Sequence, residues 1–345
     1  VLFRSRLYRA GRQAALLLDA ARESLAAAVG APASEVGLVA SSDEAIRRAV
    51  LGRPAGPIVV SAVEHSAVLG AADEAAAAGN EIRVVGVDAR GRVDPAEFAA
   101  ALPGATLACL QTANHEVGTR QPVDEVAQAC RAAGVPLLVD ARASLGWLPA
   151  PKEWDLLVGS AHGWGGPSGQ GLLAVRTGVR WQLPDQAAGG THRLDVGPVS
   201  IPLAVAAARG LEWAQEHRES EAARAFTLTS RIRDVVARDI DDVVLLGDPA
   251  HRLPNLAAFS CLYVDGEALV LDLDRAGYAV SSGSSCVADT RRPSHVLAAM
   301  GVLTQGNVRV TVPYGCADAT VDGFLATLPG IVQDIRAIVG APDNA

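Results

Sequence analysis

Lysine is the residue that this sequence most clearly lacks. The chain has 345 residues and 30 basic side chains, yet Lys152 is its single lysine and arginine supplies the other cations. Any chemistry that needs a side-chain primary amine therefore depends on one residue. Lys152 lies in the segment Pro149-Ala150-Pro151-Lys152-Glu153, which we expect to form an exposed turn.

Three further shortages exclude whole classes of protein. The five cysteines show neither close pairing nor metal-ligand spacing, so we expect no disulfide framework, no metal site and a reducing cytoplasmic location. Acidic residues outnumber basic ones by 38 to 30, and this net charge of −8 argues against a nucleic-acid surface. No run of about 18 uncharged apolar residues occurs, so the sequence predicts no membrane span.

What remains is typical of a large α/β enzyme. Half of the residues are hydrophobic, which is enough for a sizeable core and for two domains. Strand-like and helix-like patterns alternate, with a strand expected at residues 82–87 and helices at 95–102 and 123–133. Repeated β-α units predict a mostly parallel sheet with helices on both faces, whose active site lies at the carboxyl ends of the strands.

The expected domain boundary lies near residue 210. Residues 1–210 would form the large α/β domain, and residues 211–345 a smaller α+β domain. A helix is predicted over residues 201–216, and the second domain would begin its own pattern near Ala223. Its predicted strands are residues 243–246, 257–264 and 308–312.

Polar residues stand directly after four predicted strands, and two more polar segments come late in the chain. The segments are Glu64 to Val68, Asn114 to Pro122, Asp140, Ser160 to Gly163, Ser281 to Cys286, and Asn307 to Arg309. In order, spacing and residue identity they resemble the motifs of the cysteine desulfurases, which are class V aminotransferases of PLP-dependent fold type I. The resemblance spans roughly residues 6–335.

The resemblance implies a fold, a cofactor and partners. The fold would be a mostly parallel seven-stranded-type sheet flanked by helices, with a smaller α+β C-terminal domain. The cofactor would be pyridoxal 5'-phosphate (PLP), the sulfur donor L-cysteine or a related compound, and the partners a protein sulfur acceptor and a second copy of the chain in a homodimer. Because the sequence begins with Val1 and with a helix expected over residues 8–29, we expect a truncated N-terminal segment.

Two residues match the family's contacts to the cofactor ring. Asp140, at the end of a buried strand, matches the carboxylate that holds the proton on the pyridine nitrogen and so keeps the ring an electron sink. His65 matches the histidine that stacks on the ring and helps to move protons. Without the resemblance, an aspartate there would more commonly cap a helix, and a histidine in such a turn would be a structural hydrogen-bonding group.

Cys286 is the candidate sulfur carrier. It ends a loop of serine and glycine, and Arg291 and Arg292 follow it, so the surroundings suit a thiolate that attacks sulfur and holds it as a persulfide. The other reading is an inert buried cysteine, which we expect for Cys109, Cys130 and Cys261 in their apolar patterns.

Arg309 matches the arginine that pairs with the substrate carboxylate, a role suited to its bidentate fork. The alternative is a surface strand residue. Ser160 and His162 match contacts to the phosphate and the ring. The family's asparagine beside the ring hydroxyl aligns with His115, while Asn114 stands one place earlier.

Three positions depart from the family pattern. The Schiff-base lysine is expected between His162 and Trp164, where this chain has Gly163, which has no amine. A phosphate-binding threonine aligns with Asp43, whose carboxylate would repel a phosphate by about 1–4 kcal/mol in a surface-like dielectric. The glutamine expected after the strand aspartate aligns with Ala143. We therefore expect PLP binding to be weakened or lost.

Three hypotheses follow from these matches and departures. The first is a cysteine desulfurase-like enzyme that uses PLP and a Cys286 persulfide. The second is a PLP-independent persulfide carrier or sulfurtransferase. The third is a non-catalytic pseudoenzyme that binds a partner in sulfur transfer. A PLP absorption band separates the first from the others, and loss of sulfur transfer on Cys286→Ser separates the second from the third.

Overall fold

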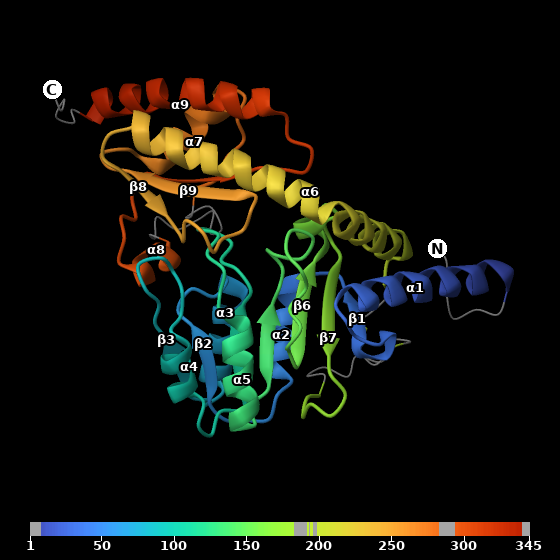
Figure 1. The fold of residues 1–345 in the computed structure, drawn as a ribbon. Coiled ribbons are helices and arrows are strands. Elements are labelled where there is room, and N and C mark those ends of the chain that lie inside the picture. The colour runs from blue at the N-terminus through green and yellow to red at the C-terminus, as the bar shows by residue number, and fades with distance from the viewer. Residues whose placement is uncertain (1–7, 183–191, 193, 196–198, 283–293, 340–345) are drawn as a thin grey trace. The chain divides into compact units, whose positions relative to one another are not determined.

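The structure, a computed structural model, describes residues 8–182, 192, 194–195, 199–282 and 294–339 (Figure 1). The chain divides into two compact units. Unit 1 comprises Val1–Gly86, Val93–Ala113 and Gln121–Arg218, and unit 2 comprises Val87–Arg92, Asn114–Arg120 and Glu219–Ala345. Two short segments from the first half of the sequence thus belong to unit 2. The predicted domain limits, 1–210 and 211–345, stay a prediction.

Unit 1 is built on a seven-stranded sheet in the order β1-β7-β6-β5-β4-β2-β3. Its strands are β1 (Val36–Val39), β2 (Ile58–Ser61), β3 (Ile82–Val85), β4 (Leu107–Gln111), β5 (Leu137–Asp140), β6 (Leu156–Ser160) and β7 (Gly171–Val175). Strand β7 runs antiparallel to both of its neighbours, and the other neighbouring pairs are parallel. The predicted mostly parallel seven-stranded sheet is therefore confirmed.

Four helices of unit 1 connect consecutive strands of this sheet: α2 (Ser42–Leu51), α3 (Ser66–Ala77), α4 (Pro95–Ala101) and α5 (Val123–Ala133). Helix α1 (Arg9–Ala28) precedes β1, and short 3₁₀ turns lie at Ala33–Glu35 and Ala161–Trp164. Apolar side chains of α2 and α3 pack in one core cluster with β2, β4 and β6. The chain adds β3 on one side of β2 and then β4 on the other side. Because parallel crossovers are right-handed, this reversal of strand order assigns α4 and α5 to the other face.

The reversal of strand order places a topological switch point between β2 and β4, and α/β sheets form their sites at such points. The loops after β2, β4, β5 and β6 all leave from the carboxyl edge of the sheet. They carry Glu64, Thr112, Arg142 and His162 in that order. The fold thus brings together the polar segments of unit 1 that the sequence singled out.

The helix predicted over residues 201–216 is much longer than expected. Helix α6 runs without a break from Ile201 to Asp239, 39 residues, and passes from unit 1 into unit 2. The stretch after Glu216 reads His-Arg-Glu-Ser-Glu-Ala and contains no glycine or proline, so nothing in it ends a helix. The predicted end of this helix at Glu216 was therefore wrong.

Unit 2 contains a three-stranded antiparallel sheet in the order β10-β9-β8. Its strands are β8 (Val243–Leu246), β9 (Leu256–Cys261) and β10 (Asn307–Thr311), and its helices after α6 are α7 (Gly266–Arg275), α8 (His295–Met300) and α9 (Asp318–Val339). The three strands fall where the sequence predicted them. In the described part of the chain, no helix is long and apolar enough to cross a membrane.

Candidate functional site

Asp140 and Arg142 form a bidentate ion pair just beyond the end of β5. The Arg142 Nε donates to both carboxylate oxygens of Asp140, at 2.9 and 3.0 Å, and Nη2 donates to Oδ2 at 2.7 Å. The Arg142 backbone N–H adds a bond of 3.0 Å to Oδ1. The side chains are only 6% and 10% exposed, for Asp140 and Arg142 respectively, so this is a buried pair.

The same guanidinium reaches a second carboxylate. The Arg142 Nη1 donates to Asp43 Oδ1 at 2.5 Å, and the Asp43 side chain is 63% exposed. Asp43 lies in the first turn of α2, whose N-cap Ser41 accepts a hydrogen bond from the Asp43 backbone N–H. A carboxylate in the first turn of a helix is stabilised by the helix dipole. We call the arrangement Asp140–Arg142–Asp43 the ion bridge.

The ion bridge keeps Asp140 and Arg142 charged. Burial alone would raise the pKa of Asp140, but the charge and hydrogen bonds of Arg142 outweigh it and lower the pKa below its ordinary value. Burial opposes the charge of Arg142, whereas Asp140 and Asp43 together raise its pKa. Opposite charges within hydrogen-bond distance each favour the charged form of the other. The ion bridge therefore has two negative charges around one positive charge.

Gly163 lies under the backbone of Arg142. A Cβ atom at position 163 would be 2.2 Å from the Arg142 carbonyl oxygen, a contact that only a shift of the backbone could relieve. Lys152 precedes β6, whereas Gly163 follows it, and the five residues of β6 span about 16 Å. Lys152 is exposed, as predicted, and its amine cannot reach the position of Gly163.

Glu64 is a buried acid beside the ion bridge. Its side chain is 0% exposed, and its Oε1 accepts a hydrogen bond from the Gln111 backbone N–H at 3.0 Å. Burial raises the pKa of Glu64 from 4.5 to about 8, and the charge of Asp140 adds to this effect while Gln111 and Arg142 oppose it. Glu64 is thus mostly protonated at neutral pH.

His65 is the N-cap of α3. Its Nδ1 accepts a hydrogen bond from the Ala67 backbone N–H at 3.0 Å. On the far side of β5, the hydroxyl of Ser160 and the Nδ1 of His162 are 2.8 Å apart. Ser160 is buried and His162 exposed. Asp140, His65, Ser160 and His162 therefore share one edge of the sheet of unit 1.

The candidates in unit 2 form a second group. The Asn114 Oδ1 accepts from the backbone N–H groups of Glu116 and Val117, so this amide stabilises its own turn. The Arg309 Nη1 donates to the His115 carbonyl oxygen at 2.9 Å. Burial raises the pKa of Glu116, although Arg309 is among the charges that oppose this, and the His115 Nε2 lies 3.6 Å from its Oε1.

Cys286 lies outside the described residues. Ser281, at the start of the segment that leads to it, pairs with Arg309 through two backbone hydrogen bonds of 2.7 and 3.1 Å. Cys109, Cys130 and Cys261 are buried free thiols, as expected, and Cys316 is partly exposed. Among the residues that the structure describes, no cluster of His, Cys, Asp or Glu could hold a metal ion.

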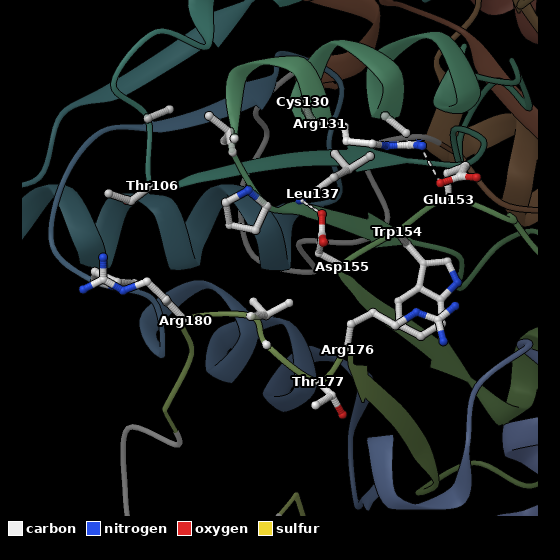
Figure 2. A pocket seen from close by; sticks show the side chains of 18 residues that line it. Thr106, Cys130, Arg131, Leu137, Glu153, Trp154, Asp155, Arg176, Thr177 and Arg180 are labelled. Carbon is white, nitrogen blue, oxygen red and sulfur yellow. Dashed lines mark hydrogen bonds and ion pairs between the residues drawn. The ribbon is translucent and has the colours of Figure 1, made fainter.

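A separate pocket of about 720 Å³ opens at the opposite edge of the sheet of unit 1. Figure 2 shows its lining, where Arg131 forms an ion pair with Glu153 and the Arg176 guanidinium stacks on Trp154 at 3.7 Å. Most of its residues precede the parallel strands β2, β4, β5 and β6, and the rest follow the antiparallel strand β7, whereas the ion bridge and His65 follow the parallel strands. This pocket is therefore not part of the candidate site.

Two residues of the site escaped the sequence analysis. Arg142 stands two residues after Asp140, and this short spacing indicated that the two opposite charges could pair. Its second partner, Asp43, is 99 residues away, and only the fold reveals it. Glu64 directly precedes His65 and follows an apolar strand, a position that predicts burial. Its raised pKa, however, depends on burial and on the charges around it, which only the fold reveals.

Known proteins resemble this chain over nearly its whole length. The aminotransferase class-V family matches residues 2–322. A cysteine desulfurase of Nostoc sp. is 32% identical over 347 residues, covering 97% of this chain and 86% of the relative. A cysteine desulfurase of Gluconacetobacter diazotrophicus is 34% identical over 355 residues, covering 99% and 89%. The solved structure of a NifS-like protein superposes with a TM-score of 0.88 at 27% identity, covering 96% and 91%.

The sheet order and these similarities define the architecture of PLP-dependent fold type I, as the sequence predicted. Within that class, the chain belongs to the aminotransferase class-V family, and its relatives include the cysteine desulfurases. Membership in this family implies PLP as the cofactor.

The residues at this edge of the sheet agree only in part with what PLP requires. Asp140, Ser160, His162 and His65 offer the acceptor and donor groups that the family resemblance assigns to the cofactor. Against this, both oxygens of Asp140 are already bound to Arg142, and a carboxylate stands at the start of α2. Position 163 has neither an amine nor space for a Cβ. In this conformation the residues do not fit PLP.

Proposed function

We propose that this chain mobilises sulfur in the manner of the cysteine desulfurases, with Cys286 carrying the sulfur as a persulfide. The full-length similarity to proteins named cysteine desulfurase supports the class. One contact carries the proposal further: the backbone pairing of Ser281 with Arg309, because it ties the start of the Cys286 segment to the candidate carboxylate-binding arginine.

The central step is sulfur transfer to a thiolate. The Cys286 thiolate attacks the terminal sulfur of a persulfide donor, a sulfur–sulfur bond forms, and the donor's own sulfur–sulfur bond breaks to release its thiol. With L-cysteine as the donor, the overall balance is L-cysteine plus the Cys286 thiol giving L-alanine plus the Cys286 persulfide. A protein thiol then takes the sulfur by the same exchange.

The two donors have different support. L-Cysteine is favoured by the family and by Arg309, whose guanidinium is held in place by the His115 carbonyl oxygen and can pair with an amino acid carboxylate. A donor that already contains a persulfide is favoured by Gly163, since the backbone of Arg142 closes the position of the family's lysine. The donor is the part of the function that experiment must decide.

The remaining parts of the proposal follow the family and the thiol chemistry. We propose that the chain works as a homodimer with a protein sulfur acceptor. We also propose a reducing cytoplasmic location, which accords with the four free thiols among the described cysteines. A protein that binds the acceptor without carrying sulfur is the competing hypothesis.

The test measures protein-bound sulfur that cyanide can remove. Purified protein is incubated with L-cysteine and PLP, or with glutathione persulfide, and the sulfur bound is compared for the wild type, Cys286→Ser and Cys316→Ser. Cys316 is the control because it is a free and partly exposed thiol of unit 2. We expect the wild type and Cys316→Ser to bind sulfur and Cys286→Ser to lose it.

The donor that loads Cys286 identifies the route. Loading by L-cysteine with release of alanine establishes the desulfurase reaction, and loading by glutathione persulfide alone establishes a carrier. If neither donor loads Cys286, or if Cys286→Ser binds as much sulfur as the wild type, the proposal is wrong.

A further inference from the structure

The ion bridge places charges where the family resemblance expects the two charged ends of PLP. At one end is Asp140, the partner expected for a protonated pyridine nitrogen. At the other end is the first turn of α2, where the resemblance aligns a phosphate-binding threonine with Asp43. One side chain, Arg142, spans the two ends.

Each end of the ion bridge carries the sign of charge that PLP would have there: positive beside Asp140 and negative at the start of α2. The Arg142 guanidinium gives Asp140 a cation that donates hydrogen bonds, as a pyridinium would, and it does so through two nitrogens. The Asp43 carboxylate supplies a negative charge at the N-terminus of α2, where a phosphate would be favoured by the helix dipole. The chain itself therefore supplies a charge at both ends of the site.

We propose that Arg142 and Asp43 act as an internal substitute for the charged ends of PLP, so that the cofactor binds only by displacing the ion bridge. This proposal concerns the ion bridge alone and does not depend on the sulfur chemistry proposed for Cys286. A lowered affinity of the site for PLP would thus be due to Arg142 and Asp43.

Electrostatics and burial both act against displacement. The bridge already carries two carboxylates and one guanidinium, so a phosphate dianion would add negative charge beside Asp43. Displacing Arg142 would also break the bidentate pairing of a guanidinium that is only 10% exposed. Removing both substitutes should remove both obstacles, because it frees Asp140 and takes away the repelling carboxylate.

The test uses pyridoxamine 5'-phosphate, which keeps the ring and phosphate but cannot form a Schiff base with Lys152 or the chain's amino terminus. Binding is followed by calorimetry and by the fluorescence anisotropy of the probe. The variants are Asp43→Thr, Arg142→Ala and the double variant. Arg131→Ala is the control, because it also removes an arginine paired with a carboxylate, at the opposite edge of the sheet.

We expect the wild type and Arg131→Ala to bind this probe weakly, and the double variant to bind it at least about tenfold more tightly. Asp43→Thr keeps the buried pair of Arg142 and Asp140 and should give part of this gain in affinity. It therefore tests the proposal even if Arg142→Ala does not fold. Binding by the wild type as tight as by the double variant would overturn the inference. So would an absence of any gain in Asp43→Thr and in a folded double variant. Sulfur loading of Cys286 is measured separately, so the two proposals fail independently.

Discussion

The carbonyl oxygen of Arg142 lies 2.2 Å from the point that a Cβ on Gly163 would occupy. The two residues are thus adapted to each other: the arginine backbone fills space that any side chain at position 163 would need. The same Arg142 holds Asp140 with its side chain. A lysine could not be restored to this site by one substitution without moving the arginine.

Adding a side chain at position 163 should destabilise the protein. We expect Gly163→Ala and Gly163→Lys each to lower the free energy of unfolding by about 1–3 kcal/mol, because the clash is with backbone rather than with a flexible side chain. Urea denaturation measures the change. Gly70→Ala is the control, since a Cβ there meets nothing within 4 Å and alanine favours helix α3. A Gly163→Lys variant as stable as the wild type would contradict this packing.

The two carboxylates of the ion bridge should differ in their effect on stability. Asp140→Ala leaves a buried guanidinium with one partner, and we expect it to cost about 3 kcal/mol. Asp43→Ala removes a carboxylate that is 63% exposed, and we expect a cost of less than about 1 kcal/mol. Chemical denaturation of both variants at one ionic strength measures the two losses of unfolding free energy. Equal losses would show that the Arg142–Asp140 pair does not contribute more to stability than the Arg142–Asp43 pair.

Glu64 should make the protein less stable as the pH rises. Its pKa in the folded state is about 8, whereas its ordinary value is 4.5, so the folded state holds a proton that the unfolded state releases between these values. The free energy of unfolding therefore falls as pH rises through this window, with a slope of at most about 1.4 kcal/mol per pH unit from this group.

The Glu64→Gln variant isolates that effect. Glutamine keeps an oxygen for the Gln111 backbone N–H and cannot ionise. We expect its stability to change less than that of the wild type between pH 5 and pH 8, measured by urea denaturation at several pH values. Parallel pH profiles for the two proteins would show that Glu64 is ionised in the fold.

Arg309 should determine the affinity for an amino acid donor. We expect Arg309→Gln to weaken binding of L-cysteine by about tenfold or more, because a carboxylate loses a charge-assisted pair. Binding is measured by calorimetry, with glutathione persulfide loading of Cys286 as the comparison. Unchanged affinity for L-cysteine would show that Arg309 serves only its contact with the His115 carbonyl oxygen.

Much of the fold was readable from the sequence because its signals are local. Apolar runs marked the strands, and helix α5 falls at Val123–Ala133, where the amphipathic pattern predicted it. The length of α6 was misjudged because a change of unit was expected to break the helix, whereas the residues after Glu216 all permit it. The class of the protein followed from motifs with fixed spacing.

The state of the candidate site was less predictable. Position alone indicated that Asp140 ends a buried strand, and the fold confirms this. Its pairing with Arg142, and through it with Asp43, depends on where two distant loops meet. The loss of the amine at Gly163 was visible in the sequence, but the closure of that space by a backbone carbonyl was not.

Mass spectrometry of the peptide that contains Cys286 tests the central claim most directly. The protein is supplied with L-cysteine and PLP in one sample and with glutathione persulfide in another, then digested without reductant. The account predicts the mass of one added sulfur atom on Cys286 in at least one sample, and its loss after treatment with dithiothreitol. An unmodified Cys286 in both samples, or added sulfur on Cys316 instead, would contradict the account.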